Sequence, residues 1–162
     1  MNIKQSSGFA MIEVLLAVVV LAIGLLAGSK MQMLGMNYTQ GAQMRTNATM
    51  AANDIIDRMR VNMDGVIAGD YIDADTDSLP NDPNCITTGC TPAQLAAHDI
   101  RVWAAYFGKV DGSDTTTPLV GANGTITQNA SGIYTIEITW SELINGEEDP
   151  DERSVSVGVD FN

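Results

Sequence analysis

The sequence contains few of the side chains on which enzymatic catalysis depends. Its 162 residues include one histidine and two cysteines. It has no nucleophile motif, no glycine-rich loop for a phosphate or a dinucleotide, and no zinc-protease motif. If the two cysteines form a disulfide, almost nothing remains for acid–base or nucleophilic chemistry. We therefore expect a protein that is not an enzyme and has no cofactor.

Basic residues are also scarce in the C-terminal part of the chain. From Gly65 onward three Lys or Arg face sixteen Asp or Glu, a net charge of −13, whereas the residues up to Asp64 sum to +1 and the whole chain to −12. Because nucleic-acid phosphates require basic side chains, this excludes a nucleic-acid partner. The charge fits a soluble surface, or one that meets cations or basic partners.

The feature that is abundant is an apolar run near the N-terminus. Residues 9–29 are long enough to span a membrane and contain one charged residue, Glu13. A charge at that depth costs about 2.5–3.5 kcal/mol on insertion scales and marks function by default. Cleavage between Gly8 and Phe9 would place a new α-amine one helical turn from Glu13, in the same chain or in a neighbour. A secretory signal peptide cut after residues 27–29 is the rival, but it explains neither the charge nor the length of the run.

Helical character extends beyond this run to about Met63. One apolar face is predicted from residues at steps of three or four: Met44, Ala48, Ala52, Ile55, Met59 and Met63. We expect Asp64-Gly65 to end the helix and residues 66–90 to form an irregular loop.

A second helix is predicted to start after Thr91. Thr91 and Gln94 have the spacing of a capping box, and Pro92 suits the first helical position. Gly108 is expected to stop this helix. Its predicted buried stripe is Ala96, Ile100, Trp103 and Phe107.

The remainder is predicted to be β-structure. Apolar residues alternate with polar ones over 134–140 and again over 155–161, with an acidic turn containing Asn145-Gly146 between them. This pattern predicts an antiparallel hairpin with a long loop. Residues 119–126 are a candidate for another strand.

Cys85 and Cys90 are expected to form a disulfide in an exported domain. Zinc is the alternative, but His98 would have to complete a set with too few ligands. Asp73, Asp75 and Asp77 resemble the start of a calcium-binding EF-hand loop. However, Ser78 and Asn84 occupy the positions of the loop's glycine and glutamate, so we favour a solvated acidic loop with no metal.

The N-terminus resembles the type IV prepilin signal. In that signal a short leader with a basic residue ends in glycine, phenylalanine follows, and glutamate stands at the fifth mature position. Here these residues are Lys4, Gly8, Phe9 and Glu13. The resemblance implies cleavage after Gly8 by the prepilin peptidase and N-methylation of Phe9. It also implies that Glu13 pairs with a neighbour's N-terminus during assembly.

Later segments are similar to the PilV type of minor pilin. They are Asp-Arg-Met-Arg-x-Asn at 57–62, Cys-Thr-Pro-Ala-Gln-Leu-Ala at 90–96 before a tryptophan-containing helix, and Tyr-Thr-Ile-x-Ile-x-Trp at 134–140. The implied fold class is α+β, with a long N-terminal helix packed on a small antiparallel sheet. Major pilins often carry a proline in this helix, but residues 9–64 contain none. The resemblance therefore does not imply that the helix melts on assembly.

The resemblance predicts four segments: a leader (1–8), a transmembrane and filament-core helix (9–29), its amphipathic continuation (30–63) and a globular head (64–162). It implies a single pass through the inner membrane with the head in the periplasm, then incorporation into a pilus, in a tip complex that primes assembly. Its implied partners are other minor pilins, the major pilin and the prepilin peptidase, with a tip adhesin as a further candidate. The alternatives are a minor pseudopilin of a type II secretion system and, less favoured, a membrane-anchored calcium-binding module.

Overall fold

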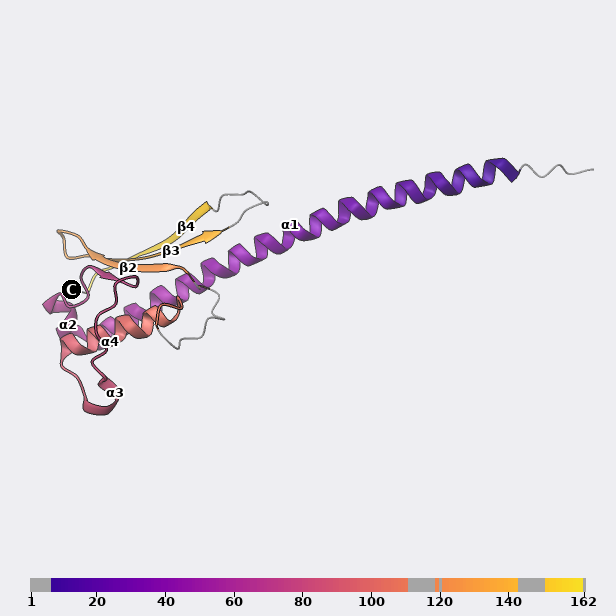
Figure 1. Cartoon of the computed structure of the whole chain (residues 1–162). Coiled ribbons are helices and arrows are strands. Elements are labelled where there is room, and N and C mark those ends of the chain that lie inside the picture. Colours follow the sequence, from indigo (N-terminus) through magenta and orange to yellow (C-terminus); the bar gives the residue numbers. More distant parts are fainter. Residues whose placement is uncertain (1–6, 111–118, 120, 143–150, 162) are drawn as a thin grey trace, which may run out of the picture. The chain divides into compact units, whose positions relative to one another are not determined.

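The computed structural model describes residues 7–110, 119, 121–142 and 151–161 (Figure 1). The chain divides into two compact units, Met1–Gln40 and Gly41–Asn162. Helix α1 (Ser7–Val61) runs without interruption from the first unit into the second. The two units differ in what surrounds this helix.

In the first unit, α1 exposes a long run of apolar side chains. It contains a window with a mean hydropathy of 2.7, none of which is buried inside the protein. Large residues such as Leu15, Leu21 and Leu26 are each more than half exposed. By its length and composition this part of the helix could cross a membrane. A helix also satisfies its own backbone hydrogen bonds, as the interior of a membrane requires.

The second unit, residues 41–162, is called the head from here on, and one face of α1 lies in its core. The predicted residues Ala48, Ala52, Ile55 and Met59 are buried and Met44 is packed against the core, which confirms the stripe except at Met63, which is half-buried and lies beyond the end of α1. The small alanines let other elements come close to the helix backbone. The indole Nε1 of Trp103 donates a hydrogen bond of 2.9 Å to the backbone carbonyl of Ala51.

The prediction that Asp64-Gly65 ends the long helix is wrong. Helix α1 ends at Val61, and Asp64 and Gly65 lie within a second helix, α2 (Met63–Ala68). The break occurs at Asn62, whose side chain is buried and donates to partners outside the helix. Gly65 is required beside it, because a β-carbon there would lie 2.6 Å from Asn62 Nδ2.

The segment expected to be an irregular loop contains short regular elements. Besides α2 they are strand β1 (Ala74–Asp75) and helix α3 (Cys85–Thr88). Helix α4 (Pro92–Ala105) follows with the predicted capping box, in which Thr91 and Gln94 bond each other reciprocally. Its predicted stripe is buried, including Phe107 just beyond its end.

The four strands form one antiparallel sheet in the order β1-β2-β3-β4. The predicted hairpin is present as β3 (Tyr134–Glu142) and β4 (Asp151–Val159), while its predicted turn at Asn145-Gly146 lies outside the described residues. Strand β2 (Asn123–Gln128) begins later than residue 119. Before it the chain turns, with Gly121 in the left-handed region and the Ala122 amide bonded to the Leu119 carbonyl.

The sheet packs its apolar face onto α1 and α4, and the backbone of β2 lies very close to two aromatic rings at Gly124. Trp103 and Phe107 meet edge to face with ring centroids 5.3 Å apart. A β-carbon on Gly124 would lie 2.5 Å from Cη2 of Trp103 and 3.0 Å from Cε2 of Phe107. Only glycine allows β2 to lie directly on this aromatic pair.

We predict that Gly124→Ala destabilises the head by about 1–3 kcal/mol, because the buried rings have no free space into which to move. Gly158→Ala is the matched control, since its β-carbon would meet nothing nearer than Ile133 Cγ2 at 3.9 Å. Thermal unfolding of the two variants measures the difference. Equal melting temperatures would contradict the packing argument.

Candidate assembly site

The proposed cleavage junction lies in the first turns of α1. The helix begins at Ser7, so the backbones of Gly8 and Phe9 are helical, while Lys4 lies outside the described residues. Glu13 follows Phe9 by four residues, which places both on one side of the helix about 6 Å apart along its axis. The structure brings these sequence-predicted residues together simply because they share one helix.

The Glu13 side chain is exposed and has no ion pair or hydrogen bond with any residue that the structure describes. Its neighbours along the helix surface, Ile12, Leu16 and Ala17, are apolar. A carboxylate in such a setting needs a cation once water is withdrawn. An α-ammonium created at Phe9 supplies one, in the same chain or a neighbouring one, and the positive end of the helix dipole adds to the attraction.

Three glycines farther along α1 leave its backbone accessible. β-Carbons added to Gly24, Gly28 or Gly35 would meet nothing within 4 Å. The fold of this chain therefore does not require glycine at these positions. They permit close helix–helix approach, although glycine is also simply common in membrane helices.

The head contains a buried polar cluster that the sequence did not reveal. Tyr71 Oη donates to Asp99 Oδ2 at 2.6 Å, and Asn62 Nδ2 donates to Tyr71 Oη at 3.0 Å and to the Pro92 carbonyl at 2.8 Å. Arg58 approaches the other oxygen of Asp99 at 3.6 Å. Tyr71 and Asp99 are 28 residues apart, so no local pattern could have linked them.

The residues of segment 57–62 have structural roles in and around this cluster. Arg58 pairs with Asp54 at 2.8 Å, Arg60 pairs with Asp57 at 2.7 Å, and Met59 is buried in the core. Asn62 then joins the end of α1 to the start of α4. Burial, followed by the hydrogen bond to Asp99, raises the pKa of the Tyr71 hydroxyl, so the folded head holds it protonated.

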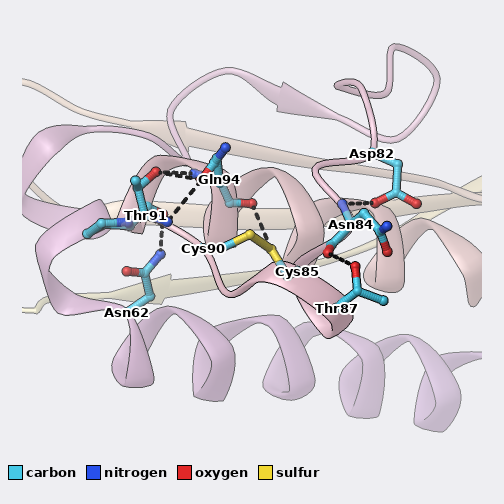
Figure 2. Close-up of a disulfide and its surroundings, with 9 residues drawn as sticks. Asn62, Asp82, Asn84, Cys85, Thr87, Cys90, Thr91 and Gln94 are labelled. Atoms are coloured by element: carbon cyan, nitrogen blue, oxygen red, sulfur yellow. Dashed lines mark hydrogen bonds between the residues drawn. A yellow bond between two sulfur atoms is a disulfide. The ribbon is translucent and has the colours of Figure 1, made fainter.

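Cys85 and Cys90 are joined in a disulfide that links α3 to the start of α4 (Figure 2). The sulfur of Cys85 lies 3.6 Å from the carbonyl of Gln94, and the capping box follows directly after Cys90. Because both sulfurs are in the disulfide, neither cysteine is available as a thiolate ligand for zinc.

The three aspartates that resemble an EF-hand do not share a site. Asp73 has a left-handed backbone with φ 59°, and Asp75 lies in β1, where its Oδ1 accepts from the Asp77 amide at 2.8 Å. The carboxylate of Asp77 is paired with Lys109. Among the residues that the structure describes, no three His, Cys, Asp or Glu side chains are grouped to hold a metal ion.

Two family models match consecutive parts of the chain. Residues 3–29 match the prokaryotic N-terminal methylation motif, and residues 30–101 match the type IV pilin Tt1218 model. Together they cover the leader, α1 and the head as far as most of α4. No curated protein and no solved structure matches the chain.

We predict that Tyr71→Phe lowers the stability of the head by about 1–3 kcal/mol, because buried Asp99 loses its hydroxyl donor. Above about pH 10, the ordinary pKa of tyrosine, the unfolded side chain ionises, whereas the raised pKa keeps the folded one protonated. Stability therefore falls as pH rises. In Tyr71→Phe the free energy of unfolding should therefore decrease less over this pH range. Denaturant unfolding between pH 8 and 11 tests this, with exposed Tyr38→Phe as control, and an unchanged pH slope would contradict it.

We predict a loss of about 2 kcal/mol in the double variant Cys85→Ser/Cys90→Ser, because the disulfide closes only a short loop. Reduction of the unaltered protein should lower its melting temperature by the same amount. Thiol titration of the unfolded, unreduced chain gives the independent check. Two reactive thiols would show that the bond is not formed.

Proposed function

Because the chain belongs to the type IV pilins and carries their prepilin leader, we propose that it is a minor pilin that primes pilus assembly, in a complex at the filament tip. At the coarser level it is a structural subunit of a pilus or pseudopilus, processed by the prepilin peptidase and assembled with other pilins. Its apolar helix supports membrane anchoring before assembly. We propose a single pass with the head in the periplasm.

Glu13 is the observation that carries the assembly role. Its carboxylate is exposed on an apolar helix and has no partner among the described residues. Glu13 belongs to the first unit of the chain, whereas the folded head is the second unit. A charge that is expensive in lipid and unnecessary for folding is best explained by a partner met during assembly, namely the N-terminal ammonium of a neighbouring pilin.

The charge of the head supports a minor rather than a major role. Residues 41–162 contain six Lys or Arg against nineteen Asp or Glu, a net charge of −13. In a filament built from this chain alone, strongly acidic heads would be close neighbours and would repel one another. Subunits of different charge on either side remove that repulsion. The motifs at 57–62, 90–96 and 134–140, similar to the PilV type, support the same role.

The proposed role is structural and uses no cofactor. The sole histidine, His98, is partly buried on α4, and both cysteines are in the disulfide. A minor pseudopilin of a type II secretion system is the second candidate, because it would share the leader and the architecture. In vivo crosslinking distinguishes the two by whether the neighbours are pilus or secretion subunits.

We predict that Glu13→Val still inserts, is still cleaved after Gly8 and still folds its head, but reduces pilus number severalfold. The physical reason is that an apolar side chain inserts at least as well, yet cannot pair with a neighbour's ammonium. Mass spectrometry of the mature N-terminus measures cleavage, the melting temperature of the head measures folding, and electron microscopy measures pilus number.

Two comparisons make this test specific. Substituting a bulky leucine for Gly8 should leave uncleaved precursor in the membrane, which separates a processing defect from an assembly defect. Quantitative mass spectrometry of sheared pili should find the unaltered chain far less abundant than the major subunit. Normal piliation with Glu13→Val would refute the role of the carboxylate, and a dominant abundance would refute the minor role.

A further inference from the structure

Strand β4 forms one end of the sheet and presents an open edge. The strand order places β3 on one side of it, and no described residue pairs with its other side. It is nine residues long and pairs with β3 in continuous register from Asp151 to Val159. In an antiparallel ladder every second residue directs its N–H and C=O away from the neighbouring strand, so this edge offers a row of backbone groups for another strand.

The apolar face of the sheet is incompletely covered at the same edge. The inward residues of β3, from Tyr134 to Trp140, are buried. The corresponding residues of β4, Val155, Val157 and Val159, are packed against the core but only partly buried. A fifth strand with apolar residues at alternate positions would cover them, as β3 and β4 cover each other.

Several devices by which proteins usually block an edge strand are missing from β4. The strand is not short, has no proline or lysine, and contains no bulge in its pairing with β3. On its outer face Ser154, Ser156 and Gly158 are small. These features leave the backbone accessible to an extended chain.

Charge determines which kind of chain fits this edge. Strand β4 begins with Asp151 and Glu152, and Glu142 of β3 is the register partner of Asp151. Arg153, the single basic residue of the strand, pairs with Asp151 at 3.2 Å and lies 3.9 Å from Glu142, so one positive charge faces these three carboxylates. A second copy of this chain would bring another acidic head to the edge, whereas a basic segment would meet complementary charge.

We propose that the β4 edge binds an extended, basic segment of another polypeptide by strand addition. The added strand runs antiparallel to β4, with apolar residues beside Val155 and Val157 and with Lys or Arg at its C-terminal end, next to Asp151 and Glu152. Backbone hydrogen bonds supply register, the alternating apolar residues supply affinity, and the charges set direction. This surface does not depend on the role proposed above for Glu13.

Full-length protein in detergent micelles provides the test. The probe is a fluorescent nine-residue peptide in which valine alternates with threonine and the last two residues are lysine. We expect saturable binding by fluorescence anisotropy and slower amide exchange confined to β4. Matched peptides should bind at least tenfold more weakly: one with glutamate for both lysines, and one with proline at its centre, which removes the central hydrogen bond.

Two protein variants carry the same charge change on opposite faces of β4. Val157→Lys places a charge on the inward face and should weaken peptide binding at least tenfold, whereas Ser156→Lys, on the outer face, should change it less than threefold. Melting temperatures verify that both variants fold. If Val157→Lys does not fold, the proline peptide decides the question on the unaltered protein.

Three results would overturn the proposal. They are an absence of saturable binding to the unaltered protein, equal binding of the proline or glutamate peptide, and equal effects of the two lysine substitutions in folded protein. Concentration-dependent exchange protection of β4 without peptide would assign the edge to a second copy of this chain and would refute a basic partner.

Discussion

The structure depends on one helix that meets two different surroundings. Helix α1 satisfies its own backbone hydrogen bonds along its length, so it can continue from an apolar environment into a protein core without changing conformation. Over residues 14–28 its side chains are apolar on every side, whereas in the second unit only one face is buried. Only the side chains, and not the backbone, have to differ between the two surroundings. The head packs on the helix face that starts at Ala48.

Small residues on that face determine how the head packs. Ala48, Ala51 and Ala52 are buried, and the missing volume is filled by the large ring of Trp103, which reaches the Ala51 carbonyl. The same ring lies on Gly124 of β2. One aromatic side chain thus joins α1, α4 and the sheet, and a single glycine in the sheet makes that possible. Interiors packed in this way tolerate little added volume.

The head also uses buried polar groups to define where α1 stops. Asn62, Tyr71 and Asp99 satisfy one another, and Asn62 reaches the carbonyl of Pro92. Buried polar groups are expensive without partners, so alternative endings of the helix that separate them are disfavoured. The disulfide then holds α3 against the start of α4 on the same side of the head.

The two units divide the work of an assembling subunit. The apolar helix is long enough to anchor the subunit in a membrane, and its single carboxylate is the group that we propose pairs with a neighbour. The head contributes strong negative charge and an open strand edge, both of which favour neighbours unlike itself. Electrostatic repulsion between like heads and the proposed attraction to basic segments both favour a neighbour that differs from this chain. The heterotypic assembly that we propose would therefore depend on the surface of the head as well as on the helix.

Much of this protein was determined by the sequence itself, wherever the signal is local. The apolar run with Glu13, the capping box at Thr91 and the alternation in β3 and β4 each depend on residues within a few positions of one another. The helix face from Ala48 to Met59 is of the same kind. The tertiary structure decided whatever depends on distant contacts. The end of α1 at Asn62 rather than at Gly65, the pairing of Tyr71 with Asp99 and the site of Gly124 beneath Trp103 are examples. The edge position of β4 is another, because strand order, unlike periodicity, is set by which surfaces remain to be buried once the chain has folded.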